Sequence, residues 1–320
     1  MLLIGIDGGG SHTRAIVVNE QGAVLARVSV GSSNLNSTVA HVVQHHIEQL
    51  IHDLVEQVPT LVDETKYVYG GFAGAYQPQN AEQLKHWFST LLPKAVITVA
   101  DDSLIALYAG TLGKPGIVQI VGTGSGTYGL SVAGERLRAG GWGYIIDDVG
   151  SGYDIGNSAM KEVFRAYDGR GEKTSLTGRL LAHFDEDAVP NLIRHIYNGD
   201  AKGTLAPLSL YVSEEAAKGD VVAQQIIQQA AEQVAHSLNA VAQQFGASHV
   251  PIVKIGSVWQ AHQFQQYVER AVAFEAQWIT PYYPAEMGAI FAIASLEQLS
   301  LTTEQLQQGY QAWQQERGVK

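Results

Sequence analysis

The stretch IGIDGGGSHTRAIVV, residues 4–18, is the most informative part of this sequence. Apolar runs on either side of an aspartate, three glycines and a serine predict two strands, residues 2–7 and 13–19, joined by a glycine tip. Three glycines beside a core strand are costly, because glycine loses the most backbone freedom on folding and has no side chain to pack. This cost indicates that something must approach the bare backbone at the turn.

The same pattern returns in GIVQIVGTGSGTYGLSV, residues 116–132, as a strand, a turn of glycines and hydroxyl residues, and another strand. Backbone N–H groups in such turns form anion-binding nests, so two of them could hold a polyphosphate. The Walker spacing is absent, and the dinucleotide fingerprint requires a helix after the glycines, whereas a strand is predicted here. Any phosphates are therefore expected between two hairpins.

Hydrophobic periodicity divides the chain into two α/β halves. We predict an N-terminal domain, residues 1–113, and a C-terminal domain, residues 114–295, with a shared hinge and cleft. A C-terminal helix in residues 296–320 is expected to pack back on the first domain. Between the hairpins we predict a strand at 24–30, a helix at 39–57, a strand at 67–74, a helix at 80–92 capped by Asn80, a strand at 95–103 and a helix at 104–113. After them we predict a longest helix at 214–245 and a strand at 250–256.

The composition excludes several classes of protein. The 320 residues include no cysteine, which rules out disulfides, thiolate zinc sites and cysteine-ligated iron–sulfur clusters. A net charge of −11 argues against a nucleic-acid partner. There is no apolar run of about 20 residues and no signal-peptide pattern at the start, so we expect a cytoplasmic protein that does not span a membrane.

Five motifs carry a family resemblance, which covers residues 1–295. GIDGGGSHTRAIVV, GTGS and KIGS resemble the two phosphate turns and the adenosine turn of the actin/hexokinase/Hsp70 superfamily. GGWGYIIDDVGSGYDIG and IGSVW are similar to the N-acetylglucosamine kinase branch of the BadF/BadG/BcrA/BcrD ATPase family. The resemblance implies two RNase H-like α/β domains flanking a nucleotide and sugar cleft, with ATP and Mg²⁺ as cofactors. It also favours a homodimer.

The resemblance assigns the chemical roles to two aspartates. Asp102, at the end of the predicted strand AVITVADD, would be the base that deprotonates the acceptor hydroxyl. Asp101 departs from the family pattern, which has Asn or Thr there, and adjacent residues on a strand face opposite sides. Asp7 would hold Mg²⁺ through water. The alternatives are that Asp102 caps the following helix and that Asp7 serves its own turn.

The resemblance also implies the binding residues. The nucleotide would contact Gly8, Gly9, Gly10, Ser11 and Thr13 on one phosphate turn, Thr123, Gly124 and Ser125 on the opposite turn, and Gly256 and Ser257 beside the adenosine. The alternative is that these glycines form ordinary tight hairpins. The sugar would contact Asn34, Gly74, Asp102, Gly141, Trp142, Gly143 and Asp148. Trp142 could instead fill the core, because tryptophan is usually buried.

These assignments predict phosphorylation of an amino sugar, N-acetyl-D-glucosamine above all, to its 6-phosphate. Glucosamine and N-acetylmuramate stay open as substrates, and a non-catalytic sugar sensor is the alternative of a different class. The absence of cysteine rules out the activators of 2-hydroxyacyl-CoA dehydratases in this family and the zinc motif of the repressor/ORF/kinase sugar kinases. A cluster of histidines (His41, His45, His46 and His52) lacks the HExxH glutamate and is predicted to form a solvated helix face.

Overall fold

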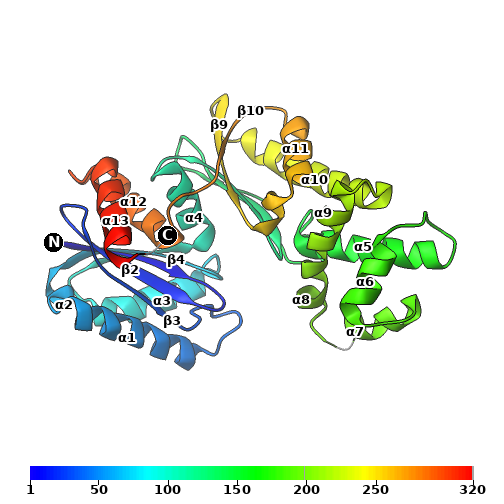
Figure 1. Cartoon of the computed structure of the whole chain (residues 1–320). Coiled ribbons are helices and arrows are strands. Elements are labelled where there is room, and N and C mark those ends of the chain that lie inside the picture. The colour runs from blue at the N-terminus through cyan, green and yellow to red at the C-terminus, as the bar shows by residue number, and fades with distance from the viewer. Residues whose placement is uncertain (198, 319–320) are drawn as a thin grey trace. The chain divides into compact units, whose positions relative to one another are not determined.

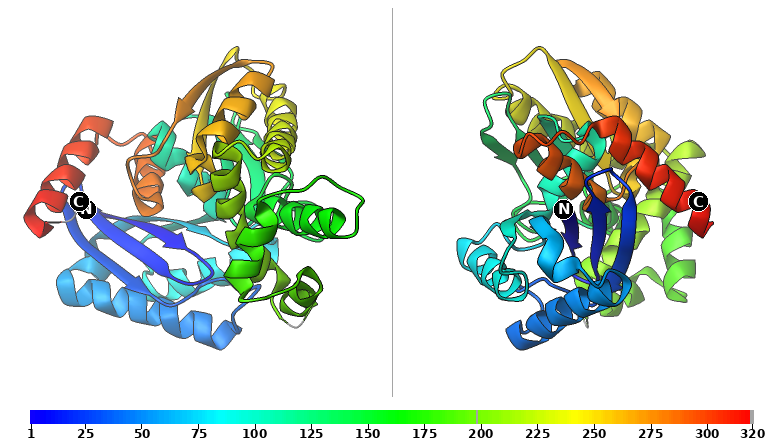
Figure 2. Two further views of the ribbon diagram at one scale, coloured as in Figure 1. Left: turned by 45° about the vertical axis from the view of Figure 1, so that its right-hand side comes forward. Right: turned by 90° about the vertical axis from the view of Figure 1, so that its left-hand side faces the viewer.

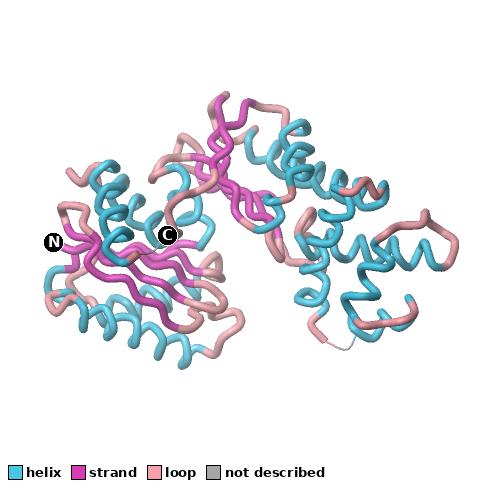
Figure 3. Tube along the Cα trace, in the orientation of Figure 1, coloured by secondary structure: helices cyan, strands magenta, loops and turns pink. Residues whose placement is uncertain are grey.

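The chain forms two compact units in the computed structural model, which describes residues 1–197 and 199–318. One unit comprises Met1–Pro115 together with the segment from Ile279 onward, and the other comprises Gly116–Trp278. Each unit combines a five-stranded sheet with helices, as Figure 3 shows by colour. The predicted α/β class is confirmed.

The N-terminal unit is built on a mixed sheet in the strand order β3-β2-β1-β4-β5. Its strands are β1 (Leu2–Gly8), β2 (Thr13–Asn19), β3 (Val24–Val30), β4 (Thr65–Phe72) and β5 (Val96–Asp101). The first three form the predicted antiparallel meander, whereas β4 and β5 run parallel to β1. The carboxyl ends of β1, β4 and β5 therefore meet at one edge.

Helices cover both faces of this sheet (Figures 1 and 2). The helices are α1 (Ala40–Gln57), α2 (Leu61–Glu64), α3 (Pro78–Leu91), α4 (Asp102–Thr111), α12 (Ala285–Leu296) and α13 (Thr303–Arg317). Helix α1 buries Val43, Ile47, Leu50 and Leu54, a 3.6-residue repeat, against Ile4 on β1. Gly5, the next residue on β1, faces the opposite side, where it meets the Ala289 and Ile290 side chains of α12.

The second boundary between the units differs from the predicted one. We placed residues 279–295 in the C-terminal domain, but α12 lies in the N-terminal unit. Eight of its residues, Glu286–Ile293, are buried, so this apolar helix is core for the first sheet. Helix α13 packs on the same unit, where Gly309 approaches the turn between β2 and β3 at Gly22. Residues 319–320 of the predicted terminal helix lie outside the described residues.

The second unit repeats the strand order of the first. Its sheet reads β10-β9-β6-β7-β8 and consists of β6 (Gly116–Val121), β7 (Ser125–Leu130), β8 (Arg136–Ala139), β9 (His249–Ile255) and β10 (Glu275–Ile279). The strands β6, β7 and β8 form an antiparallel meander, and β9 runs parallel to β6. The order third, second, first, fourth, fifth thus occurs in both sheets, and each begins with the hairpin predicted from the repeated motif.

Most of the helices belong to this second unit. The α-helices are α5 (Gly152–Tyr167), α6 (Leu176–Phe184), α7 (Ile193–Tyr197), α8 (Ala201–Leu205), α9 (Ser209–Ala217), α10 (Val221–Ala242) and α11 (His262–Ala271), and the 3₁₀ helices are η1 (Val189–Leu192), η2 (Ala206–Leu208) and η3 (Ser257–Gln260). The single helix predicted over 214–245 is wrong, because Gly219 takes a φ of +97° and Asp220 caps a new helix by accepting from the Ala223 N–H at 2.9 Å. Among the described helices, none combines the length and the apolar character that crossing a membrane requires.

Candidate functional site

The tip of the first hairpin leaves its backbone open. Strand β1 ends at Gly8 and β2 begins at Thr13, and the Gly9 N–H donates to the His12 carbonyl at 2.9 Å. Gly10 and Ser11 are exposed, and a Cβ added to Gly10 would have its nearest neighbour, the Asn34 amide nitrogen, 3.9 Å away. This part of the turn has the room that close approach of a phosphate needs.

Tight packing, rather than open space, explains the glycine at position 8. A Cβ on this residue would lie 2.1 Å from the Phe72 ring and 2.4 Å from the Ser33 hydroxyl oxygen. The glycine run therefore combines a packing requirement at Gly8 with open space at Gly10. Thr13 also has a structural role, because it is 1% exposed and its hydroxyl donates a hydrogen bond to the Gly31 carbonyl at 2.8 Å. The prediction that the Thr13 hydroxyl faces a phosphate is not met in this structure.

Asp7 stands beside this turn in an acidic setting. It pairs across the sheet with Arg14 on β2, whose Nη1 lies 3.7 Å from the Asp7 carboxylate. Burial, followed by the charges of Glu286 and Asp102, raises the Asp7 pKa from 3.8 to about 6, while the charges of Arg14 and Arg27 oppose the rise. Asp7 is therefore a half-buried carboxylate whose ionised form a cation bound next to it would stabilise.

Asp102 is the first residue of α4, and strand β5 ends one residue earlier. The prediction that Asp102 ends the strand is therefore wrong, and so is the argument that it and Asp101 alternate on a strand. Burial, followed by the charge of Asp101, raises the Asp102 pKa to about 6, while hydrogen bonds from the N–H groups of Asp102 and Ser103 oppose the rise. Asp101 is the N-cap residue and its carboxylate accepts from the Ser103 hydroxyl.

Asn34 and Gly74, which are both predicted to contact the sugar, lie close together. Gly74 has a φ of +86°, and a Cβ on it would lie 2.8 Å from the Asn34 side-chain oxygen. Asn80 does not cap α3, which begins at Pro78 after the N-cap Gln77. Its amide instead donates to the Gly74 carbonyl at 3.1 Å and so fixes the loop that follows β4.

His46 is a supporting residue that sequence reasoning missed. Its Nδ1 lies 2.8 Å from the Ser32 carbonyl, and its ring packs where a Cβ on Gly31 would be. The ring therefore holds the loop that carries Asn34, and the prediction of a solvated helix face is wrong for His46. The helical period does separate it from His45: His46 lies three residues after Val43 and four before Leu50, beside the buried stripe of α1, whereas His45 is exposed on the other face.

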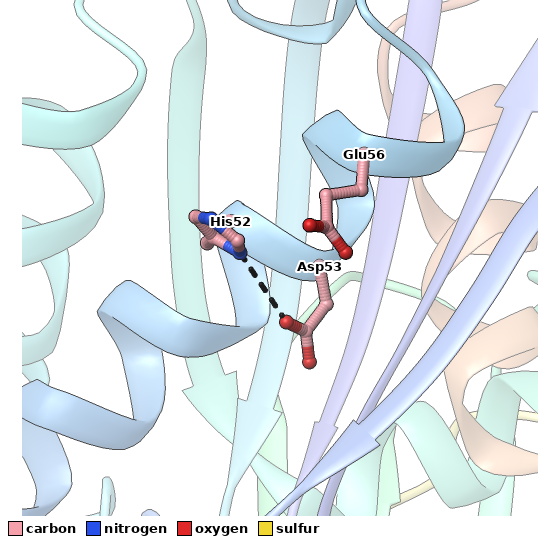
Figure 4. A group of neighbouring side chains, drawn as sticks. All are labelled: His52, Asp53 and Glu56. Atoms are coloured by element: carbon pink, nitrogen blue, oxygen red, sulfur yellow. Dashed lines mark ion pairs between the residues drawn. The ribbon is translucent and has the colours of Figure 1, made fainter.

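The solvated face is found further along α1. His52, Asp53 and Glu56 approach one another there, and the His52 Nδ1 lies 3.5 Å from an Asp53 carboxylate oxygen (Figure 4). The His52 side chain is 70% exposed, and Glu56 is exposed as well. Such groups are common on solvated helices, so we assign no metal to this cluster.

The second hairpin tip rests on the start of α5. The Gly122 N–H donates to the Gly124 carbonyl at 2.9 Å, and the Gly122 carbonyl accepts from the Gly152 N–H at 2.8 Å. Ser125 uses its hydroxyl to hold the Val149 carbonyl at 2.6 Å, while Thr123 stays exposed. The predicted phosphate turn is thus anchored by Ser125 and leaves Thr123 accessible.

Gly256, in the predicted adenosine turn, packs closely against the strand end that leads into this phosphate turn. It has a φ of +109°, and a Cβ would lie 2.2 Å from the Val121 carbonyl, so only glycine fits. Next to both turns lies a cavity of about 630 Å³, a size typical of small-molecule sites. Its lining consists of Gly122, Thr123, Gly152, Gly203, Ala206, Pro207, Ser209, Leu210, Ser213, Ser257, Val258, Gln260 and Ala261.

The GGWG segment lies on the surface of the same unit. Gly141 and Gly143 have φ values of +73° and +98°, and Trp142 between them is 56% exposed. The Arg138 guanidinium stacks on the Trp142 ring with its carbon 3.7 Å from the centroid. Trp142 is therefore not core filler and presents an aromatic surface.

Asp148 is the most constrained of the predicted sugar residues. It is 5% exposed and has a φ of +58°, a strained conformation for a residue with a side chain. Its carboxylate lies 3.3 Å from the Lys202 ammonium and within van der Waals reach of Gly124. No motif marks Lys202 in the sequence, where it is a single cation in the short helix α8.

Comparisons with known proteins come from sequence and from structure. The chain is 35% identical to an N-acetylmuramic acid/N-acetylglucosamine kinase of Clostridium acetobutylicum, over 78% of this chain and 82% of the relative. It is 32% identical to an N-acetyl-D-glucosamine kinase of Dictyostelium discoideum, over 77% of this chain and 80% of the relative.

A solved structure from Chromobacterium violaceum, named as a candidate N-acetylglucosamine kinase, superposes with a TM-score of 0.67 at 24% identity. The superposition covers 91% of this chain and 98% of that chain, and it establishes a shared fold. Residues 4–292 match the model of the BadF/BadG/BcrA/BcrD ATPase family. This chain therefore belongs to the BadF/BadG/BcrA/BcrD ATPase family.

Proposed function

We propose that this protein is an ATP-dependent kinase that phosphorylates an amino sugar, N-acetyl-D-glucosamine, at its 6-hydroxyl. Family membership supports the use of ATP, and the names of the two curated relatives support an amino sugar as acceptor. The name of the Clostridium relative also favours N-acetylmuramic acid as a second substrate. Glucosamine remains an alternative acceptor.

Asp102 carries the catalytic part of this proposal. Phosphoryl transfer depends on positioning the acceptor and on taking its proton as the bond forms. A general base works best when its pKa lies near the working pH. With a pKa of about 6, Asp102 is ionised at neutral pH yet binds a proton far more tightly than an ordinary aspartate. We assign it the role of accepting the proton from the sugar hydroxyl.

Asp7 fits the role of magnesium holder. Mg²⁺ prefers carboxylate oxygens and keeps several of its waters, and the half-buried Asp7 carboxylate beside the open glycine turn offers that donor. The ion would supply neutralisation of the phosphate charge. Gly9, Gly10 and Ser11 would contribute backbone N–H groups and a hydroxyl from the same turn.

The nucleotide residues of the second unit support the ATP assignment. Thr123 and Gly124 would contact phosphate groups, and Gly256 and Ser257 would lie beside the adenosine. The cavity next to these turns suits a nucleoside, because its lining combines apolar side chains with serine and glutamine side chains.

The proposed sugar residues come from both units. Asn34 and Gly74 belong to the first unit, and the segment Gly141–Gly143 and Asp148 belong to the second. Asparagine and aspartate would bond ring hydroxyls, and Trp142 would offer an apolar face to the sugar ring. The expected homodimer and cytoplasmic location stay predictions; light scattering of the purified protein tests the dimer.

A coupled assay of ADP release tests the function. Purified protein is given ATP and Mg²⁺ with N-acetylglucosamine, N-acetylmuramate, glucosamine, N-acetylmannosamine or glucose. We expect turnover with N-acetylglucosamine that falls at least about a hundredfold in Asp102→Asn, the loss typical of a general base. Asp101→Asn is the matched control and should keep most of the activity. ATP binding without turnover on any sugar would instead favour a non-catalytic sensor.

A further inference from the structure

We propose that Lys202 binds the phosphate groups of the nucleotide. This inference rests on the proposed function, since it adds a residue to the nucleotide site. The starting observation is that the Lys202 ammonium reaches the tip of the second glycine hairpin from α8, about 80 residues further along the chain.

The geometry around Gly124 carries the argument. A Cβ built on Gly124 would lie 3.2 Å from the Lys202 Nζ and 2.7 Å from an Asp148 carboxylate oxygen. Gly124 does not need a positive φ, so the close approach of these two charges accounts for the glycine. The lysine ammonium is thereby held directly against the backbone of a turn with anion-binding character.

The Lys202 ammonium has more N–H donors than its contact with Asp148 uses. An ammonium group carries three N–H donors, and one is directed to the Asp148 carboxylate at 3.3 Å. The ammonium also lies 5.4 Å from the centre of the Tyr144 ring. The side chain is 31% exposed, so an anion arriving at the turn can reach the ammonium, whereas the Asp148 side chain is only 6% exposed. In the Lys202–Asp148 ion pair, the lysine is thus the partner that solvent and ligands can reach.

The neighbouring cavity lacks a charge of its own. None of its lining residues among those that the structure describes is Lys, Arg, Asp or Glu. The protein carries a net charge of −11, which opposes the approach of a polyphosphate. Gly203, the residue after Lys202, lines this cavity, so the lysine stands at its edge. A compact ammonium at that position is well suited to phosphate oxygens.

Calorimetric titration of the whole chain with ATP, ADP and adenosine, without sugar, tests this role. In Lys202→Met we expect ATP and ADP to bind about 10- to 100-fold more weakly, the usual effect of losing one charge-assisted hydrogen bond. Adenosine should bind as tightly as to the wild type, because it has no phosphate. Lys202→Arg should recover part of the loss, and Lys161→Met, at an exposed lysine on α5, should change nothing.

The outcomes separate this inference from the proposed function. An ATP affinity within twofold of wild type in Lys202→Met would overturn the role of Lys202 while the kinase proposal stands. An equal loss for adenosine would also overturn it, because that result indicates a structural role. If Lys202→Met does not fold, Lys202→Gln takes its place with the same expectations. Wild-type protein that binds neither ATP nor adenosine would contradict both proposals.

Discussion

Asp7 and Asp102 stand at the carboxyl edge of the first sheet, where β1 and β5 flank β4, and the charge of Asp102 helps to raise the Asp7 pKa to about 6. Burial is the larger cause for both residues. Two neighbouring carboxyl groups with raised pKa values are typical of a functional site, because their ionised forms do not stabilise the fold.

The pH dependence of the reaction should reflect Asp102. Above its pKa of about 6 the carboxylate is ionised and can accept a proton; below that value it cannot. We therefore expect kcat at saturating substrates to fall about tenfold for each pH unit below about 6. A profile that stays flat down to pH 5 would contradict the role of Asp102 as base.

Asp102→Asn should stabilise the protein while it removes activity. Because the pKa in the folded state lies above its ordinary value of 3.8, the folded protein binds the proton more tightly than the unfolded chain. The free energy of unfolding therefore falls as the pH rises from about 4 to 6, and the full penalty is present at neutral pH. We expect Asp102→Asn to raise the free energy of unfolding at pH 7.5 by about 1–3 kcal/mol.

Urea unfolding in EDTA measures this gain. The control is Asp63→Asn, since Asp63 is exposed and its pKa is lowered by Lys94, the opposite direction. The control should therefore not become more stable. A loss of stability in Asp102→Asn would show that the penalty assigned to this carboxylate is absent.

The buried Glu286 makes Arg27 important for stability. Glu286 is 1% exposed, and the Arg27 Nη2 lies 2.5 Å from its carboxylate. Arg27→Met leaves a buried charge without its partner, so we expect a loss of about 3 kcal/mol in unfolding free energy. The double variant Arg27→Met with Glu286→Met should recover much of that loss.

Lys94→Met serves as the control for that comparison, because the Lys94–Asp63 pair is exposed and such pairs contribute at most about 1 kcal/mol. Chemical denaturation of the four proteins gives the answer. If Arg27→Met costs no more than Lys94→Met, the buried pair does not stabilise the fold as argued.

His46 should matter for sugar binding and His45 should not. The His46 ring supports the Ser32 carbonyl in the loop that carries Asn34, whereas His45 is exposed. We expect His46→Ala to raise the KM for the sugar several-fold with the KM for ATP unchanged, and His45→Ala to change neither. Equal values for the two variants would contradict the supporting role of His46.

Asp148 should separate sugar binding from nucleotide binding. Asp148→Asn removes the negative charge and replaces one of the two oxygens that would accept from sugar hydroxyls with an NH₂ donor, and it frees Lys202 from its carboxylate partner. The sugar affinity should therefore fall at least about tenfold, while ATP should bind as tightly as before or more tightly. Parallel loss of both affinities, measured by calorimetry, would indicate that Asp148 only maintains the local fold.

The elements that could be predicted from sequence are those with a strong local pattern. The hairpin strands, α1 and the repeated sheet follow from apolar periodicity and from glycine turns, both of which are local. The break at Gly219 was missed although the sequence carries a local signal for it, a glycine after the last turn of one helix followed by an aspartate that caps the next. The placement of α12 was missed because a helix with eight buried residues in succession carries no directional pattern that names its partner.

The candidate site also contains residues that could be predicted from local sequence and residues that could not. Asp7, Asp102 and the glycine turns stand out by residue type beside strands, and the resemblance completed the set. Lys202 could not be found, because its role arises from a contact with Asp148 in a distant segment. The helical period places His46 beside the buried stripe of α1, but its partner, the Ser32 carbonyl, could not be predicted from the sequence. Gly8 was assigned to phosphate binding although its neighbour Phe72 accounts for it, and only the packing shows this.

Identification of the product tests the central claim most directly. Wild-type protein is incubated with ATP, Mg²⁺ and N-acetylglucosamine, and the products are analysed by mass spectrometry and by ³¹P and ¹³C NMR. The account predicts N-acetylglucosamine 6-phosphate and ADP in equal amounts, with neither formed by Asp102→Asn beyond about a hundredth of the wild-type rate. ADP formed without a phosphorylated sugar, or a product phosphorylated at a carbon other than C6, would contradict it.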